Sequence, residues 1–112
     1  MTGSLIYIAS PYTTDDNELL EKRFEAVCAS CAVLMNDDLH VFSPIAHGHS
    51  ISKHGDIPTD WVYWKTICEM MIDRCQRFIV VTLDGWDKSV GVLAEIKYAE
   101  SIGLTSEYVD PV

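Results

Sequence analysis

The segment FIVVTLDGWDKSVGVLAEIKYAESIG, residues 78–103, decides the fold because it joins a strand to a helix. Residues 78–83 form the most apolar run of the chain and predict a buried strand. A polar turn follows, Ser89 stands where a helix N-cap belongs, and Gly103 ends the helix predicted over residues 89–102. A strand that leads through a short turn into a helix is typical of a β-α-β unit.

The rest of the chain repeats this alternation of strands and helices. Further strands are predicted at residues 5–9, 39–42 and 105–109, and further helices at residues 17–35 and from about residue 59. Alternating strands and helices favour parallel pairing. The sequence therefore predicts a single α/β domain over residues 1–112. It should be doubly wound, with a mainly parallel four- to five-stranded sheet of the Rossmann-like or flavodoxin-like kind.

Three polar segments follow strands in this arrangement. They are SPYTTDD at residues 10–16, SPIAHGH at residues 43–49 and DGWDKSVG at residues 84–91. The second opens a segment, residues 43–58, that is predicted to be a loop of about 16 residues. Ligands of open α/β sheets bind beyond the carboxyl ends of the strands, so these three segments are the expected binding region.

Composition narrows the class of function. The chain has a formal net charge of −9 and 48% apolar residues, and its few Lys and Arg residues do not cluster. An acidic surface repels nucleic acids, so no nucleic-acid partner is expected. No apolar run approaches the roughly 20 residues that span a bilayer, and the N-terminus lacks the pattern of a signal peptide. We expect no membrane partner and a cytoplasmic location.

The cysteines and histidines suggest metal or redox chemistry only weakly. Cys28 and Cys31 form a C-x-x-C pair, but they fall in the middle of a predicted helix, where packing is the simpler interpretation. His47 and His49 form an H-x-H pair without a third ligand at a suitable spacing. We therefore expect no metal and no cofactor, and the histidines are either surface residues or ligand contacts, with His47 favoured.

The helix that begins at Ser89 could bind a nucleotide. Its first N–H groups and its dipole favour an anion, and Gly91 lets a ligand approach the backbone. Glu95 follows six residues after Ser89, about 9 Å along a helix, within reach of the sugar of a bound nucleotide. The alternative is a capped helix with a solvated Glu95. Tyr7, at mid-strand, is either simply buried or able to hydrogen-bond a neighbouring carboxylate.

Several segments together resemble the nucleoside 2-deoxyribosyltransferase superfamily. They are IYIASPYT at residues 6–13, the E-x-R-F helix, FSPIAHGH at residues 42–49, and GWDKSVGVLAE at residues 85–95 followed by YA. The resemblance covers about residues 5–109 and is strongest to a small, compact branch. The superfamily also includes the 2′-deoxynucleoside 5′-monophosphate N-hydrolases and the CMP N-glycosidases.

The resemblance implies roles for particular residues. Glu95 would be the nucleophile that attacks the anomeric carbon, and Tyr7 would orient it. Ser89 and Gly91 would touch a 5′-phosphate. The remaining candidates for substrate contact, each with a purely structural alternative, are Ser10, Pro11, Tyr12, Arg23, His47 and Trp86.

One position departs from the family pattern. A second carboxylate, which helps to protonate the leaving base, would align at or near Cys68. A shift of one residue places Glu69 there, and Glu69 is the predicted second catalytic residue. Asp73 and Asp60 are alternatives. If none of these carboxylates reaches the site, the general acid is missing or is a histidine.

The sequence thus predicts an N-glycosidase that hydrolyses the base–sugar bond of a nucleoside 5′-monophosphate or a (deoxy)nucleoside. A deoxyribosyltransferase, a non-catalytic nucleotide-binding protein and a structural protein that keeps only the fold are the alternatives. The resemblance further implies a homodimer or higher homo-oligomer, because the enzymes of this superfamily complete their active sites with a neighbouring subunit.

Overall fold

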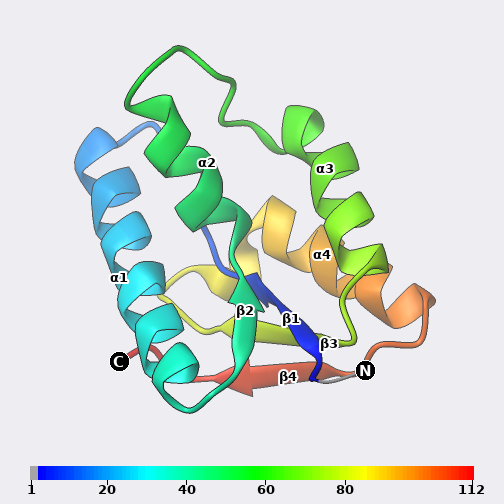
Figure 1. Ribbon diagram of the computed structural model, residues 1–112. Coiled ribbons are helices and arrows are strands. Elements are labelled where there is room, and N and C mark those ends of the chain that lie inside the picture. Colours follow the sequence, from blue (N-terminus) through cyan, green and yellow to red (C-terminus); the bar gives the residue numbers. More distant parts are fainter. Residues whose placement is uncertain (1–2) are drawn as a thin grey trace.

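The computed structural model describes residues 3–112 as a sheet of parallel strands flanked by helices (Figure 1). In chain order the elements are β1 (Leu5–Ala9), α1 (Asn17–Asn36), β2 (His40–Phe42), α2 (Pro44–Ser52), α3 (Trp61–Asp73), β3 (Arg77–Val81), a short 3-10 helix (Trp86–Lys88), α4 (Val90–Ser101) and β4 (Ser106–Val109).

The strand order is β2-β1-β3-β4, and all three pairings are parallel. The chain leaves β1, forms β2 on one side of it, and then crosses to β3 on the other side. This reversal creates a topological switch point at the carboxyl end of β1, where open α/β sheets bind ligands. The predicted doubly wound α/β fold is confirmed, with four strands in the described residues.

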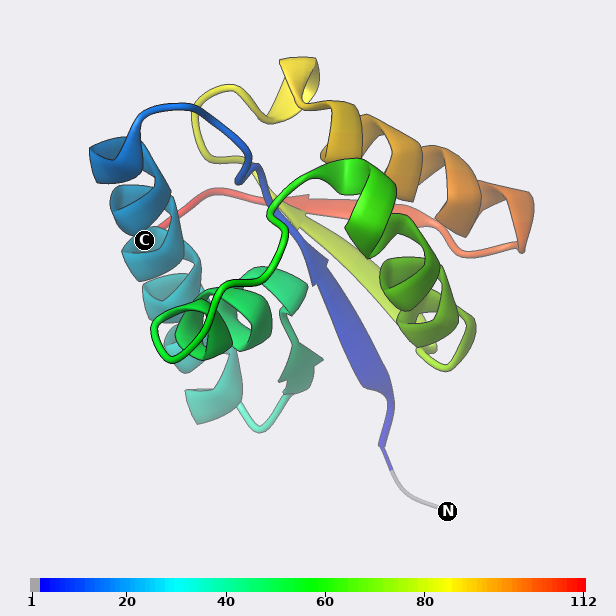
Figure 2. The ribbon, with the colours of Figure 1, turned by 90° about the horizontal axis from the view of Figure 1, so that it is seen from above.

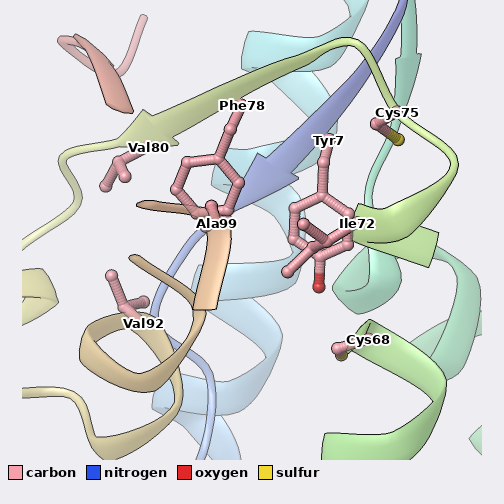
Figure 3. Packing of buried hydrophobic residues seen from close by; sticks show 9 residues of the cluster. Tyr7, Cys68, Ile72, Cys75, Phe78, Val80, Val92 and Ala99 are labelled. Atoms are coloured by element: carbon pink, nitrogen blue, oxygen red, sulfur yellow. The ribbon is translucent and has the colours of Figure 1, made fainter. Parts of the chain in front are cut away.

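Helices cover both faces of the sheet. Figure 2 shows α1 and α2 to one side of the central strands and α3 and α4 to the other. Ile6 and Ile8 of β1 pack toward α1, whereas Tyr7 and Ala9 pack toward α3 and α4. Because side chains alternate along a strand, Tyr7 is directed into the α3–α4 layer, where its ring stacks on Phe78 at a centroid distance of 5.6 Å (Figure 3).

The prediction that residues 43–58 form a loop is wrong, because α2 occupies residues 44–52. Ser43 caps this helix, with its hydroxyl accepting a hydrogen bond from the Ala46 N–H at 3.1 Å. Pro44 stands at the first helical position, where its fixed φ angle and missing N–H are favourable. A Ser-Pro pair that reads as a turn is therefore a helix start. Within residues 43–58, only the part that follows α2 is irregular.

Helix α4 begins and ends as the sequence predicts. Ser89 is its N-cap and accepts a hydrogen bond from the Val92 N–H at 3.2 Å. Gly103 follows the helix with a φ of 93°, a conformation that favours glycine. Among residues 3–112, no helix combines the length and apolar character required to cross a membrane.

Candidate active site

A cavity of about 510 Å³ opens at the carboxyl ends of β1, β2 and β3. This volume lies within the range of small-molecule sites, roughly 300–1,000 Å³. Residues from five regions line it: the β1–α1 connection, Arg23 of α1, α2 and the segment after it, the first two turns of α3, and the segment from Gly85 to Glu95. The cavity therefore occupies the switch point of the sheet.

Glu95 reaches the cavity wall from the second turn of α4, although its side chain is only 5% exposed. The Tyr7 hydroxyl donates a hydrogen bond to Glu95 Oε2. Tyr7 itself is fully buried. The strand and the helix are 88 residues apart in the chain, so the pair exists only because the fold brings β1 against α4.

Burial governs the ionisation of this pair. Loss of solvent raises the pKa of Glu95 from 4.5 to about 7, while its contacts with Tyr7 and the Cys68 thiol lower it and only partly compensate. Burial, and then the charge of Glu95, raise the pKa of Tyr7 well above 10. Tyr7 thus stays a hydrogen-bond donor while Glu95 titrates near neutral pH. A carboxyl with such a pKa in a cavity is a candidate catalytic group.

Cys68 occupies the place where the family resemblance predicts a carboxylate. It lies on α3, lines the cavity and is buried beside Tyr7 and Glu95. Figure 3 shows the Tyr7 hydroxyl pointing toward the part of α3 that carries Cys68. Burial, followed by the charge of Glu95, raises the pKa of the Cys68 thiol to about 12. A thiol in this state is neither a nucleophile nor an effective acid at neutral pH.

One end of the cavity is suited to an anion. Ser89 and Gly91 at the start of α4 line it together with Arg23 and Lys88. The Arg23 guanidinium is held in place by donating to the backbone oxygens of Tyr12 at 3.1 Å and Thr13 at 3.4 Å. Two cations beside a helix N-terminus create a local positive field despite the net charge of −9.

Ser10 adds a polar group without a partner. It is buried, it lines the cavity, and its Oγ is the one buried side-chain polar atom among the described residues that makes no hydrogen bond. Because buried polar atoms are nearly always hydrogen-bonded, the Ser10 hydroxyl is available to a ligand.

Aromatic rings form another wall. Trp61 and Trp64 of α3 line the cavity, and the Trp64 indole donates to the Pro58 carbonyl at 2.8 Å. A Cβ at Gly48 would lie 2.8 Å from the Trp64 ring, and one at Gly91 would lie 3.4 Å from Trp61. The two glycines therefore let α2 and α4 approach these indoles closely. Flat rings of this kind can stack on a heterocyclic base.

On the α1–α2 side, three polar groups form a chain. The Tyr12 hydroxyl lies 2.6 Å from His49 Nδ1, and His49 Nε2 lies 2.9 Å from Glu21 Oε1. His49 is buried, and its ring stacks on Phe24 at 4.2 Å. The hydrogen bond to His49 lowers the pKa of Glu21. Burial, and then the charge of Glu21, raise the pKa of Tyr12.

The structure brings most of the predicted site residues to one cavity. Tyr7 is joined to it through Glu95, and the predicted residues that line it directly are Ser10, Tyr12, Arg23, Asp60, Ser89, Gly91 and Glu95.

Five other predicted residues lie elsewhere. Pro11 is fully buried outside the cavity lining. His47 is exposed and its ring lies 5.9 Å from Phe42, while the Trp86 ring lies 5.3 Å from Tyr108. Glu69 follows Cys68 by one residue, which rotates it about 100° around α3, away from the lining. Asp73, at the far end of α3, accepts a hydrogen bond from Tyr98 at 2.6 Å.

Sequence reasoning missed His49, Trp61 and Trp64 as site residues. Residues Ile45, Gly48, His49 and Ser52 of α2 all line the cavity, which is the i, i+3, i+4, i+7 stripe of a helix. The Ser43-Pro44 start signal would have shown that residues 44–52 form a helix, and the stripe then separates His49 from His47.

The cysteines serve packing. The four thiols are free, and burial raises the pKa of both Cys31 and Cys75 to about 11. Within residues 3–112, no group of three or more His, Cys, Asp or Glu side chains is placed to hold a metal ion.

Comparison with known proteins gives a family but no activity. Residues 4–108 match the family model described as a domain of unknown function, DUF1937. A search of curated proteins finds no match to the chain. Because the matched segment covers nearly the whole chain, this protein belongs to the DUF1937 family.

Proposed function

We propose that this protein is an N-glycosidase that hydrolyses the base–sugar bond of a nucleoside 5′-monophosphate. One observation carries the proposal: a buried glutamate, Glu95, is held by Tyr7 at the wall of a cavity whose other groups suit a nucleotide. The resemblance to the nucleoside 2-deoxyribosyltransferase superfamily, in which a glutamate on this helix is the nucleophile, supports it.

The reaction would begin with attack by Glu95 on the anomeric carbon. One carboxylate oxygen accepts the Tyr7 hydrogen bond, which leaves the other oxygen free to form an ester with the sugar. The bond to the base breaks, and water then hydrolyses the glycosyl-enzyme. This two-step course is that of retaining glycosidases.

The environment of Glu95 suits this role. A pKa of about 7 leaves a useful fraction of the carboxylate ionised at neutral pH, and burial deprives that carboxylate of competing water. Tyr7 remains protonated and keeps the carboxylate in one orientation.

The rest of the cavity would hold the nucleotide. The 5′-phosphate would lie at the start of α4, near Ser89, Gly91 and Arg23. The unpaired Ser10 hydroxyl would contact the sugar or phosphate. Trp61 and Trp64 would flank the base.

Two finer features extend the proposal. Hydrolysis is proposed rather than transfer between bases, because a domain of this size has little room for two base sites. A homodimer or higher homo-oligomer is expected, in which a neighbouring subunit helps to close the cavity.

A nucleotide-binding protein without catalysis is the second candidate. The observation that favours it is Cys68, a neutral thiol at the position where the superfamily places a proton-donating carboxylate. In this case the cavity would bind a nucleotide and leave it intact.

A base-release assay separates the candidates. Purified protein would be incubated with ribo- and deoxyribonucleosides and their 5′-monophosphates, and free base would be detected by chromatography. Glu95→Ala is the test variant, and Glu100→Gln, an exposed glutamate on the same helix, is the matched control.

The proposal predicts release of one base or a narrow set of bases, lost in Glu95→Ala and kept in Glu100→Gln. Saturable binding of a monophosphate without release would instead establish the binding protein. Absence of both release and binding would refute both candidates.

A further inference from the structure

A departing base requires a proton, because its anion is a poor leaving group. The two groups nearest Glu95 are poorly placed to provide one: the Tyr7 hydroxyl already donates to Glu95 Oε2, and the Cys68 thiol is buried beside the same carboxylate. The donor must therefore come from another part of the cavity lining.

Besides Glu95 and Cys68, the titratable side chains that line the cavity are those of Tyr12, Arg23, His49, Asp60 and Lys88. Asp60 and Lys88 are exposed side chains in contact with solvent, and Lys88 lies beside the anion-binding start of α4. Tyr12 and His49 also line the cavity, and they are joined by a short hydrogen bond and backed by Glu21. Tyr12, His49 and Glu21 are buried or half-buried, whereas Asp60 and Lys88 are exposed.

The hydrogen bonds among Tyr12, His49 and Glu21 allow the Tyr12 hydroxyl to act either as a donor or as an acceptor toward His49. When His49 is an imidazolium, Nε2–H donates to Glu21 and Nδ1–H donates to the Tyr12 oxygen, so the Tyr12 O–H is free to donate into the cavity. When His49 is neutral with its proton on Nε2, the Tyr12 O–H donates to Nδ1. One hydroxyl can thus give a proton to a ligand and regain it.

We propose that Tyr12 is the catalytic proton donor to the leaving base, with His49 and Glu21 as positioning residues that resupply its proton. This inference rests on the proposed N-glycosidase function. It gives the site a substitute for the carboxylate that Cys68 replaces.

The proton and electron movements balance. Glu95 forms the C–O ester bond as the C–N bond breaks, and the electron pair of that bond moves to the base. The base takes the Tyr12 proton, Tyr12 takes the Nδ1 proton, and His49 becomes neutral while Nε2–H remains bonded to Glu21. When water attacks the ester, its proton returns through Tyr12 to His49 and the starting state is restored.

The groups around His49 favour this exchange. The carboxylate of Glu21 on α1 lies 2.9 Å from His49 Nε2 and is itself paired with Lys53 at 3.4 Å. Arg23, also on α1, donates to the Tyr12 carbonyl and fixes the backbone of that residue. The remaining face of the His49 ring lies against Phe24, which carries no charge.

The test uses two leaving groups. One substrate is the monophosphate whose base the protein releases, and the other is a 4-nitrophenyl riboside 5′-phosphate or its 2′-deoxy analogue. 4-Nitrophenolate departs without a proton. The variants are Tyr12→Phe, which keeps the ring, and His49→Gln. Tyr98→Phe is the matched control, because the Tyr98 hydroxyl is also hydrogen-bonded to a side chain, that of Asp73, but lies outside the cavity lining.

In both variants we expect base release to fall about 10²- to 10⁴-fold, whereas 4-nitrophenol release falls less than about tenfold. A change in this ratio reports proton donation and not merely a disturbed structure. The Tyr98→Phe protein should keep both rates.

Two results would overturn the inference in distinguishable ways. If Glu95→Ala abolishes release but Tyr12→Phe slows both leaving groups equally or neither, Tyr12 is not the proton donor and the glycosidase stands. If the wild-type protein releases neither leaving group, the proposed function fails and the proton donor fails with it.

Discussion

Glu95 and Glu21 belong to helices on opposite faces of the sheet, and each carboxyl group is hydrogen-bonded by a ring side chain. The pKa of Glu95 is raised to about 7, mainly by burial. The pKa of Glu21 is lowered, mainly by its hydrogen bond to His49. The two side chains are chemically identical, so their surroundings alone cause the opposite pKa shifts.

In the proposed reaction, this difference would let one site combine a nucleophile with a proton relay. No cationic side chain of residues 3–112 contributes to the pKa shift of Glu95, so its pKa stays near neutral pH. A carboxylate with such a pKa would be reactive when it is ionised. Glu21 has a lowered pKa and is hydrogen-bonded to His49 Nε2 at 2.9 Å, where it would support the proposed proton relay. Substitutions at the two carboxylates should therefore have different consequences.

Glu95→Gln should reduce base release by about 10⁴-fold or more, because it removes the nucleophile while keeping the size of the side chain. Glu21→Gln keeps the nucleophile and should cost far less, about tenfold to a hundredfold. Release rates measured under single-turnover conditions would compare the two. Similar losses in both variants would contradict the assignment.

Stability should respond to pH in opposite directions at the two residues. Glu95 has a folded pKa above its unfolded value, so its contribution is complete below pH 4.5 and is lost as the pH rises through about 7. The shift from 4.5 to about 7 corresponds to about 3 kcal/mol. Glu95→Gln should therefore unfold with a higher free energy than the wild type at pH 8, with no such gain at pH 4.

Glu21 provides the control for that measurement. Its folded pKa is lowered, so its contribution is present above pH 4.5 and is lost as the pH falls. In urea unfolding between pH 3 and pH 8, Glu21→Gln should have a lower free energy of unfolding than the wild type, and this difference should shrink as the pH falls. A difference in unfolding free energy that grows at low pH would mean that the pKa of Glu21 is not lowered in the folded protein.

Tyr7→Phe should slow base release about a hundredfold near neutral pH. The lost hydrogen bond also removes an interaction that lowers the pKa of Glu95, so the rise of the rate with pH should move to higher pH. Rates collected from pH 5 to pH 9 would test this. A rate that falls without any movement of the profile would indicate a role for Tyr7 other than holding the carboxylate.

Gly48→Ala should disturb the α2 side of the cavity. The added methyl group would lie 2.8 Å from the Trp64 ring, so we expect a loss of about 1–3 kcal/mol in unfolding free energy and weaker nucleotide binding. Gly55→Ala meets no atom within 4 Å and is the matched control. Thermal unfolding and calorimetric titration with a nucleotide would show whether Gly48→Ala loses stability and affinity while Gly55→Ala keeps both.

The smallest effects concern the two serine caps. Ser43→Ala and Ser89→Ala should each cost about 1 kcal/mol, because each removes the N-cap of one helix that carries the site. Only Ser89 lines the cavity, so only Ser89→Ala should also weaken binding of a monophosphate relative to the free nucleoside. Equal binding by both variants would remove Ser89 from the phosphate site.

The strands and the longer helices could be predicted because their apolar residues repeat with a clear period. Residues 5–9 and 89–102 are matched within one residue by the structure at their start and end. The hydrogen bond between Tyr7 and Glu95 could be predicted only as one of two possibilities. The alternation of side chains along a strand indicates which face of the sheet Tyr7 lies on, but not which residue it contacts there.

Apart from the Ser43-Pro44 start, the α2 side of the site carries little sequence signal, for a physical reason. Helix α2 has nine residues, and its Gly and Ser residues weaken any helical pattern. Without a helix there is no stripe, so nothing distinguishes His49 from His47. Likewise the periodic face of α3 predicts burial of Trp61 and Trp64, but the pattern is the same whether that face meets core or cavity.

The most direct test of the central claim is to trap the ester on Glu95. The protein would be incubated with a 2′-fluoro analogue of the monophosphate that it cleaves, because the fluorine slows hydrolysis of the glycosyl-enzyme by destabilising an oxocarbenium-like transition state. Mass spectrometry of the intact protein and of its peptides would follow. If Glu95 is the nucleophile, one sugar phosphate should be found on Glu95 for each base released in the first turnover. Base release with no adduct, or with the adduct on another residue, would contradict it.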